Sequence, residues 1–285
     1  MRAHTRSTAS SACGMLSLLL AFATGTAACH TSPAPPVERP RLGQWIWTRT
    51  DIARFHESAT VRPGLQAGVF IGSVHCDPVA QQLVPRVGLA ASDPHIDSVT
   101  VVIRFEDGLD RCRTSHDETQ RFDMSLDSAV RVLRTRAGHA NVSAVQLDCD
   151  APQRTIAAWA GSVRYLHQHA LTGDAVWVTS LIAQLREPAY GDLFRDAVVG
   201  HVLQVFDTGE PASATQIREA LRLARRAHMS FRLGLGAFER DTKAGPTDHR
   251  AWFALVSQFA VIDGYRGVWV FPAGQRWTTF LGAMG

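Results

Sequence analysis

The stretch at residues 142–150, VSAVQLDCD, decides the fold and is followed directly by Ala151 and Pro152. Successive side chains on a β-strand point to opposite faces, so the polar residues of this run share one face: Gln146, Asp148 and Asp150. Apolar residues occupy the other face. Pro152 ends the run, and a helical pattern begins at once. A strand that presents polar groups at its carboxyl end is typical of an α/β barrel or an open α/β sheet.

The two carboxylates of this run stand two residues apart on one strand face, which places their Cα atoms roughly 7 Å apart. They repel each other unless the face is solvated, paired with cations or used for chemistry. A solvated strand end is the simplest alternative. The pair Asp148 and Asp150 is therefore the first candidate for a functional site.

Apolar, β-rich runs recur along the chain, with helical or loop patterns between them. Near-continuous apolar strands that alternate with helices predict a parallel sheet covered on both sides. The predicted strands cover residues 45–49, 68–76, 99–107, 142–150, 175–182, 202–207, 231–238 and 267–272.

Apolar residues at helical spacing predict helices over residues 125–136, 154–171, 214–228 and 249–261. In the third of these, Ile217, Leu221 and Ala224 lie opposite arginines. The last is almost wholly apolar, which predicts that it is well buried. The first two connections are the least clear, and residues 85–95 are expected to form a loop.

The count of strand–helix units favours a closed barrel. Eight units in about 240 residues match the usual size of a (β/α)₈ barrel. The alternative is an open doubly wound sheet, but no glycine-rich phosphate loop follows the first strand, where such folds often place one. We therefore expect a single α/β domain, a TIM-like barrel over residues 43–285, and no cofactor.

The N-terminus has the pattern of an export signal. Arg2 and Arg6 precede a short apolar run at residues 13–23, which is too short for an ordinary membrane-spanning helix. Residues 26–28, Thr-Ala-Ala, then lead into Cys29 and resemble a bacterial lipobox. We predict a signal peptide over residues 1–28 and lipidation of Cys29. The alternative is ordinary cleavage, which yields a soluble secreted protein.

The proline-rich residues 29–42 are expected to form an extended tether that holds the barrel away from a membrane. The predicted protein is thus exported and anchored by lipid, facing the periplasm or the cell exterior. Its 29 basic and 26 acidic residues form no basic stripe, so nucleic-acid binding has no support. In an oxidising compartment, Cys76 and Cys112 are a plausible disulfide, whereas Cys149 is expected to be a buried thiol.

In a barrel of this kind the site lies at the carboxyl ends of the strands. Glycosidic cleavage needs an acid and a second carboxylate, and the candidates here are Asp150, Asp148 and Glu106. Substrate contacts are expected from Arg104, Gln146, Gln204, Asp207 and Trp47. Further aromatic walls are available at Trp45, Trp177 and Trp269. The alternative is a structural ion-pair layer of Arg104 with the carboxylates, and tryptophans that belong to the core.

Other constellations are weaker. His167 and His169 lie two residues apart on a predicted helix, so they do not share a face and cannot form a zinc pair. No G-x-S-x-G elbow is present for a serine nucleophile. We expect no metal site.

Several blocks resemble the bacterial domain-of-unknown-function family 3142, whose members are mostly exported. These blocks are WIW at residues 45–47, QLDCDAP at 146–152, WVTSL at 177–181 and GVWVFPAG at 267–274. The family looks like a distant relative of TIM-barrel glycoside hydrolases, which implies the same fold here. Its members often carry tryptophan shortly after the fifth strand, where this chain has Ala183 and Gln184.

The fourth predicted strand is also similar to the chitinase-type D-x-x-D-x-D-x-E block. The resemblance places Asp150 at the position of the catalytic acid, with Asp148 and Gln146 at supporting positions. Aspartate in place of glutamate shortens the reach by one methylene, and Gln146 replaces a carboxylate. Two functions follow as hypotheses: a glycoside-hydrolase-like enzyme that acts on envelope or extracellular polysaccharide, or a non-catalytic envelope lipoprotein that binds glycans or proteins.

Overall fold

The structure is a computed structural model that describes residues 41–77, 79–91, 96, 98–106, 108–112, 119–138, 141–206, 213–237, 241–242, 245–246 and 252–271. All of them belong to the unit Glu38–Gly285. The predicted signal peptide, Cys29 and nearly all of the tether lie outside the described residues, as does Asp207.

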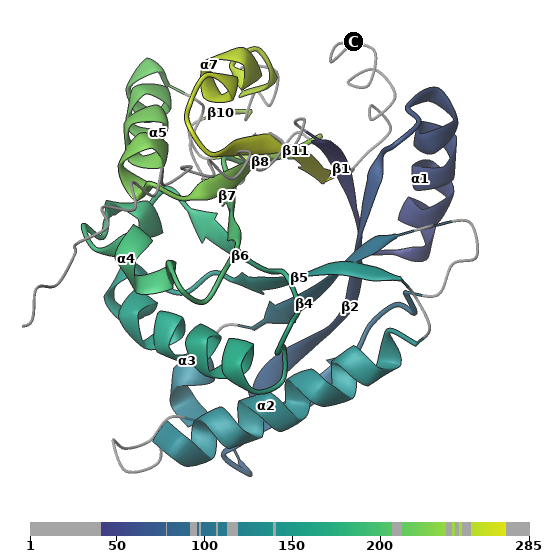
Figure 1. Ribbon diagram of the computed structural model, residues 1–285, viewed down its shortest axis with the longest axis vertical. Helices are drawn as coiled ribbons and strands as arrows, with labels where there is room; N and C mark the ends of the chain where they lie inside the picture. Colours follow the sequence, from purple (N-terminus) through teal and green to yellow (C-terminus); the bar gives the residue numbers. More distant parts are fainter. Residues whose placement is uncertain are drawn as a thin grey trace, which may run out of the picture. The chain divides into compact units, whose positions relative to one another are not determined.

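Parallel strands close into a barrel, as the sequence predicts, in the order β1-β2-β4-β5-β6-β7-β8-β11 (Figure 1). The ring closes because β1 pairs with both β11 and β2. The eight strands are β1 Arg41–Ile46, β2 Gln66–Asp77, β4 Val99–Phe105, β5 Val142–Cys149, β6 Val176–Leu181, β7 Gly200–Gln204, β8 Ser230–Gly236 and β11 Tyr265–Phe271. The carboxyl ends of all eight therefore meet at one mouth.

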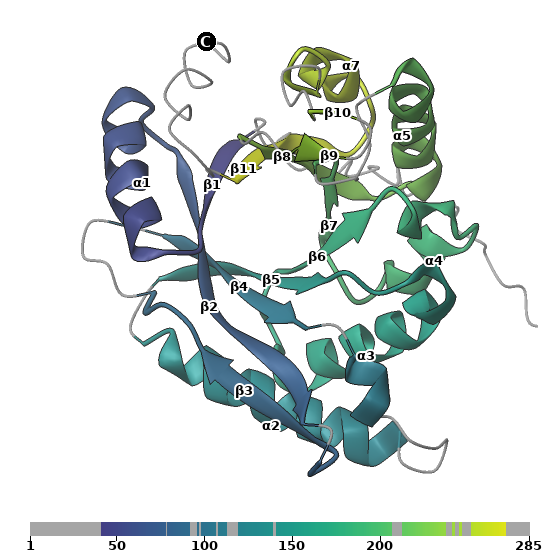
Figure 2. The same ribbon diagram turned by 180° about the vertical axis from the view of Figure 1, so that it is seen from behind.

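A further strand, β3 (Gln82–Val87), pairs antiparallel with the second half of β2 and lies outside the ring, against α2 (Figure 2). The loop predicted for residues 85–95 is therefore wrong over residues 85–87. Proline lacks the amide hydrogen that a central strand needs, so Pro85 suits a strand at the edge of the sheet. Pro85 and Arg86 also interrupt the apolar pattern, which is why the sequence did not indicate a strand here.

Helices cover the outside of the ring (Figure 1). Those predicted over residues 125–136, 154–171 and 214–228 are confirmed, and their predicted apolar residues are buried except for Ile217, which is half-buried. The α-helices are α1 Arg49–Val61, α2 Thr119–Arg136, α3 Ile156–Gln168, α4 Tyr190–Phe194, α5 Ala214–Ala227 and α7 Val256–Ala260. Short 3₁₀ turns are η1 Leu109–Cys112, η3 Gln153–Thr155 and η4 Gln184–Arg186, and β9 Asp241–Thr242 pairs with β10 Gly245–Pro246.

Helix α1 follows β1 and was not predicted. Its mean hydropathy is low and it buries few residues, so the apolar period is weak. A capping box marks its start: the Thr48 hydroxyl accepts from the Asp51 amide over 3.3 Å, and the Asp51 carboxylate accepts from the Thr48 amide over 2.9 Å. This signal was legible in the sequence as threonine followed three residues later by an acid.

The prediction of a long, well-buried helix over residues 249–261 is wrong for the residues that the structure describes, 252–261. The regular helix α7 spans only Val256–Ala260. Within residues 252–261, only Trp252 and Phe259 are buried, and Val261 is 77% exposed. Apolar composition alone does not distinguish a buried helix from a short one that anchors through two aromatic rings.

The interior of the barrel is filled by tryptophan. Trp45, Trp177 and Trp269 are at most 4% exposed and cluster with Val102, Ala144 and Val202. Glycines on β1 and β2 make the room: a Cβ on Gly43 would lie 2.6 Å from the Trp269 ring, and one on Gly68 would lie 2.1 Å from it. These three tryptophans are therefore packed core and not exposed aromatic walls, which corrects the expectation for them.

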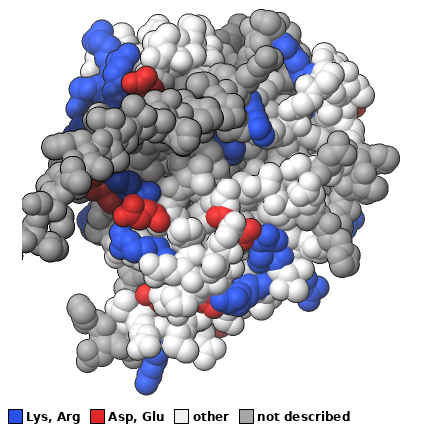
Figure 3. Space-filling view, viewed as in Figure 1, with Lys and Arg blue, Asp and Glu red and all other residues white. Residues whose placement is uncertain are grey.

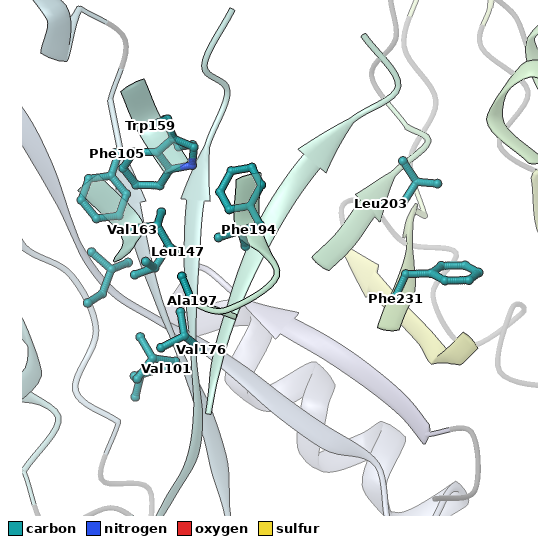
Figure 4. Packing of buried hydrophobic residues seen from close by; sticks show 14 of the residues in the cluster. Val101, Phe105, Leu147, Trp159, Val163, Val176, Phe194, Ala197, Leu203 and Phe231 are labelled. Atoms are coloured by element: carbon teal, nitrogen blue, oxygen red, sulfur yellow. The ribbon is translucent and has the colours of Figure 1, made fainter. Parts of the chain in front are cut away.

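A larger core lies between the barrel and the helices. Outward-facing residues of the strands, among them Val101, Leu147 and Val176, pack against Val163 of α3 and Phe194 of α4 (Figure 4). Two apolar layers, one inside the ring and one outside it, explain why the strands are apolar on both faces.

The predicted disulfide is confirmed. Cys76, at the end of β2, is bonded to Cys112, at the end of η1, with their Cα atoms 5.7 Å apart. Cys149 is not in a disulfide and is buried, also as predicted. The bridge ties the segment after β4 to the neighbouring strand, at the same end of the barrel as the candidate site.

Charged side chains of both signs are spread over the face shown in Figure 3, and basic ones gather over α5. They include Arg218, Arg222 and Arg225, which are exposed as the sequence predicts. Among the described helices, none combines the length and apolar character needed to cross a membrane.

Candidate functional site

The site is built on the pairing of β4 with β5. In this parallel register Arg104 lies beside Asp148, so a guanidinium from one strand faces a carboxylate from the next. Arg104 Nη1 lies 3.6 Å from Asp148 Oδ2, and its Nη2 donates to Asp150 Oδ2 over 3.2 Å. The structure therefore brings together three of the predicted site residues around one positive charge.

Asp148 is the buried member of this group, with a side chain only 4% exposed. Burial and the nearby charge of Asp150 raise the pKa of Asp148 to about 6, whereas Arg104 and the Thr179 hydroxyl act in the opposite direction. Of the two carboxylates that the sequence predicts on one strand face, Asp148 is thus the one with the raised pKa. Near neutral pH the site can therefore hold a proton on a carboxyl group.

Asp150 faces the mouth and is about one-third exposed. Its backbone is held by Gln184, whose side-chain amide donates to the carbonyl of Cys149 over 3.2 Å and to that of Ala151 over 2.8 Å. The Gln184 side-chain oxygen in turn accepts from the Leu181 amide over 2.9 Å. A fully buried glutamine on η4 therefore sets where Asp150 sits.

Gln184 holds the backbone on both sides of Asp150, and the sequence analysis did not single it out. The sequence analysis mentions position 184 only because members of family 3142 often carry tryptophan near this point of the chain. A glutamine two residues after a predicted strand has no pattern that marks it, because two of its three partners, Cys149 and Ala151, lie at the end of another strand. Only the fold shows that the loops after β5 and β6 are neighbours.

Glu106 directly follows β4 and lies at the same end of the barrel. It accepts from the Ser73 hydroxyl over 2.7 Å, and Arg86 Nη1 of β3 lies 3.4 Å from its carboxylate. Glu106 is thus held by two neighbours from β2 and β3. Its carboxylate accepts from both of these neighbours, and its catalytic role stays a prediction.

Trp47 is the one predicted aromatic wall that stays near the site. Its ring stacks on Phe70 at 4.5 Å between centroids, and the Arg104 guanidinium lies 5.7 Å from its centre. Trp47 is half-buried. It therefore supports Arg104 and leaves part of an aromatic face at the mouth.

The remaining residues predicted to contact the substrate differ in how deeply their side chains are buried below the mouth of the barrel. Gln146 is 1% exposed, accepts from Trp45 Nε1 over 3.1 Å and donates to the Thr179 hydroxyl over 3.0 Å. It lies below the mouth and holds the inner layer in place. Gln204 ends β7 and is half-buried. Asp207 lies outside the described residues, so its place stays a prediction.

A cavity opens on the outer side of β4 and β5, next to Asp150. We call it the side pocket; it has about 50 Å³ of space for the centres of water molecules. Its walls are Phe105, Glu106, Gly108, Leu109, Phe122, Cys149, Asp150, Ala151, Pro152, Thr155, Trp159 and Ser162. Because Glu106 and Asp150 line it, this cavity and the mouth share the two carboxylates.

Two other kinds of chemistry receive no support from the described residues. None of their histidines, cysteines and acids form a group of three or more that could hold a metal ion. Ser180 Oγ lies 2.6 Å from His201 Nδ1, but both side chains are fully buried. Burial lowers the pKa of His201 to about 3, so this pair is a neutral hydrogen bond between β6 and β7.

Comparison with known proteins shows the fold. No family model and no curated protein matches the chain, so the resemblance to family 3142 stays a prediction. Among solved structures, a chitinase from Bacteroides thetaiotaomicron aligns with a TM-score of 0.59 and 11% identity over 87% of this chain and 96% of that one. A GH18 chitinase from Pseudoalteromonas aurantia aligns at 0.56 with 12% identity, over 86% and 98%.

A third neighbour is a mutant GH18 chitinase from Cycas revoluta in complex with (GlcNAc)4, at a TM-score of 0.52 and 13% identity over 85% of this chain and 98% of that one. At such identities the likeness concerns the fold alone. This chain therefore has a single (β/α)₈ barrel of the kind seen in GH18 chitinases, a glycoside-hydrolase-like barrel.

Proposed function

We propose that the protein is an exported glycoside hydrolase that cleaves an envelope or extracellular polysaccharide at the mouth of the barrel. Asp150 donates a proton to the leaving glycosidic oxygen, Asp148 keeps a proton in the pair, and Arg104 and Trp47 hold the sugar. Gln204 of β7 is proposed to contribute a contact to the sugar, and Asp207 stays a predicted contact.

The observation that carries this proposal is the position of Asp148. A carboxyl group with a pKa of about 6 lies buried beside a carboxylate that is about one-third exposed, at the carboxyl end of the fourth barrel strand. Glycosidases need a carboxyl group whose pKa is raised so that a proton is kept near neutral pH. Here that proton is held on Asp148, next to the proposed donor Asp150. A purely structural ion pair gains nothing from a second carboxylate that repels the first.

The substrate is proposed to carry a 2-acetamido group. Glu106 is tied to Ser73 and Arg86 and is poorly placed to act as a second carboxylate. Substrate-assisted glycosidases, the GH18 class among them, are exceptions to the two-carboxylate rule. In such a reaction the acetamido oxygen attacks the anomeric carbon, and the protein supplies one acid. Chitin-like and peptidoglycan-like chains meet this requirement.

A second candidate is a barrel that binds glycans without cleaving them. One observation favours it: Arg104 donates to Asp150, and an ion pair stabilises the ionised form of a carboxyl group. A carboxylate that stays ionised cannot act as an acid. The short aspartate side chain at this position points the same way.

The two candidates separate in one experiment. Wild-type protein is incubated with β-linked N-acetylglucosamine oligomers and with peptidoglycan, and the products are analysed by mass spectrometry. Shortened oligomers are expected. Binding detected by calorimetry without any product supports the glycan-binding module instead, and the absence of both binding and product rejects both candidates.

Export and anchoring are part of the proposal and rest on the sequence. The apolar run before Cys29 and the proline-rich residues after it favour a lipoprotein. Cys29→Ala is expected to move the protein from the detergent phase to the aqueous phase in Triton X-114 partitioning. An unchanged detergent fraction contradicts lipidation of Cys29.

A further inference from the structure

The end of the barrel opposite the mouth, which we call the base, is formed by the amino ends of the strands. β11 lies between β1 and β8 and pairs with both. Arg41, the first residue of β1, pairs with Gly267, near the start of β11, and Tyr265 pairs with Phe231 of β8. Neighbouring strands lie about 4.8 Å apart, which places the start of β1 roughly 10 Å from the start of β8. The chain therefore enters the barrel at the base, close to β8 and to the end of α5 that leads into it.

The predicted lipid anchor is joined to this end of the barrel. Cys29 precedes Arg41 by twelve residues, and a chain of this length reaches at most about 40 Å. Lipidation of Cys29 therefore holds the base within this distance of a bilayer. The length alone does not decide which side of the barrel faces the lipid, whereas the charges on its surface do.

Basic side chains gather at the base next to this entry point. Arg218, Arg222 and Arg225 are exposed on α5 at intervals of four and three residues, so they share one face of the helix. His228 follows the helix and is exposed as well. Arg225 and His228 line a hollow together with Val261, which follows α7; α5 and α7 lie side by side (Figures 1 and 2). We call Arg222, Arg225, His228 and Val261 the basal patch.

The positive charge of the basal patch is not offset by α5 itself. Glu219 is the only acid of this helix, and Arg186 already binds it through two hydrogen bonds of 2.9 and 3.1 Å. Arg225 forms no ion pair with an acid in the described part of the chain. Among the described residues that line the hollow, Asp263 is the one acid. The patch therefore carries a net positive charge towards the solvent.

The arginines at the mouth are compensated, unlike those of the basal patch. Arg104 lies 3.2 Å from Asp150, and Arg86 lies 3.4 Å from Glu106. An anionic surface therefore attracts the basal patch more strongly than it attracts the mouth. Each arginine that reaches an anionic bilayer raises the binding constant about fivefold. At physiological salt this attraction fades within about 8 Å, so it requires contact between the patch and the lipid.

We propose that the basal patch binds the anionic phospholipid headgroups of the bilayer in which Cys29 is anchored. This inference rests on the anchoring that the proposed function includes. Arg222 and Arg225 contact the headgroup phosphates, and Val261, which is 77% exposed, contacts the apolar boundary beneath them. The mouth lies at the opposite end of the barrel, so this contact turns it away from the lipid and towards the polysaccharide.

The affinity of the patch is measured without the anchor, in Cys29→Ala. Flotation compares vesicles of phosphatidylcholine with vesicles of equal parts phosphatidylcholine and phosphatidylglycerol. The measured quantity is the ratio of the affinities for the anionic and the neutral vesicles, so contributions from apolar residues cancel. This ratio is expected to be well above one and to fall as salt is added.

Two double variants of Cys29→Ala identify the face that binds. Arg222→Gln with Arg225→Gln is expected to lower the ratio about 25-fold, at about fivefold for each charge. The matched control, Arg121→Gln with Arg154→Gln, removes the same charge from exposed positions on α2 and η3 and is expected to keep the ratio. Equal losses in the two double variants, or a ratio of one in the parent, overturn the proposal.

The orientation is tested on the anchored wild type. The protein is reconstituted into the same two kinds of vesicle and treated with phenylglyoxal, which modifies accessible arginines, and mass spectrometry locates the modified residues. Arg225 is expected to react at least about fivefold more slowly on the anionic vesicles. Arg154, which follows β5 at the mouth, is expected to react equally on both. Protection of Arg154 in place of Arg225 overturns the proposal, and slow reaction of Arg225 on both kinds of vesicle assigns the patch to the tether or to a second copy instead.

Failure of this inference and failure of the anchor are distinguishable. If Cys29 carries no lipid, the anchor is removed from the proposed function, and the flotation ratio still decides whether the basal patch binds anionic lipid. If Cys29 is lipidated but Arg225 reacts equally on the two kinds of vesicle, the anchor stands and the docking is overturned. Neither measurement depends on cleavage of a glycan.

Discussion

Arg104 Nη2 donates to Asp150 Oδ2 over 3.2 Å, which links the end of β4 to the first residue after β5. The same guanidinium lies 3.6 Å from Asp148, so one cation serves two carboxylates that would otherwise repel each other. Its side chain is 41% exposed and rests near the Trp47 ring. Because Arg104 is reachable from the mouth, a bound ligand can change the balance of charge at this pair.

Removing the positive charge is expected to raise the pKa of Asp148 above its value of about 6, because Arg104 lowers it. The change is Arg104→Gln, and Arg104→Lys is the control that keeps the charge. The pKa is measured from ¹³C shifts of side-chain carboxyl groups, with the Asp148 signal assigned by its loss in Asp148→Asn. The same pKa in wild type and Arg104→Gln contradicts electrostatic coupling between Arg104 and Asp148.

Asp148 should make the folded protein less stable as pH rises. Its pKa is about 6 when folded, against an ordinary value of 3.8, so the folded state holds more protons between these pH values. Stability therefore falls across that window and levels off above pH 6, by about 3 kcal/mol in total.

Asp148→Asn removes this dependence. We expect the variant to gain stability relative to wild type between pH 4 and pH 7, measured by urea unfolding at each pH. Taking the difference between the two proteins cancels the contributions of all other titrating groups. A difference that stays constant with pH contradicts a raised pKa.

Gln184→Ala is expected to lower the free energy of unfolding by about 2–4 kcal/mol, because it deletes three hydrogen bonds of a fully buried amide. It should also loosen Asp150 and lower activity beyond the loss of folded protein. Gln168→Ala, at an exposed position on α3, is the control and should change stability by less than about 0.5 kcal/mol. Equal effects of the two changes would show that Gln184 holds nothing in place.

The disulfide should contribute through the chain segment that it closes. Cys76 and Cys112 are 36 residues apart in sequence, and cross-linking a loop of this length stabilises the folded state by about 3–4 kcal/mol. We expect Cys76→Ser with Cys112→Ser to lose this amount in guanidinium unfolding. Wild-type protein treated with dithiothreitol should match the double variant, and a disulfide-free variant as stable as the oxidised protein would contradict the assignment.

The barrel was predictable because its signal is local. Each parallel strand is an apolar run buried on both faces, and such runs stand out between helical patterns. β3 was missed since Pro85 breaks its run, and α1 because its apolar period is weak. The Thr48–Asp51 capping box would have revealed α1.

The site was predictable only in part, because its chemistry depends on strand neighbours. Alternation on one strand indicated that Asp148 and Asp150 share a face, and the fold adds Arg104 from the next strand. The burial of the tryptophans, in contrast, could not be predicted from the pattern on their own strands. Trp269 is core because Gly43 and Gly68, more than two hundred positions earlier, leave space for its ring. No sequence pattern links residues so far apart.

The central claim is that Asp150 is a catalytic acid and not part of a structural ion-pair layer. The most direct measurement is turnover of N-acetylglucosamine oligomers by Asp150→Asn, with a thermal melt of the same sample. The amide has nearly the same shape and opens no cavity, so the account predicts a wild-type melting temperature with turnover abolished. A strongly destabilised variant, with Arg104 left without its partner, or a stable variant that still cleaves the oligomers, would contradict it.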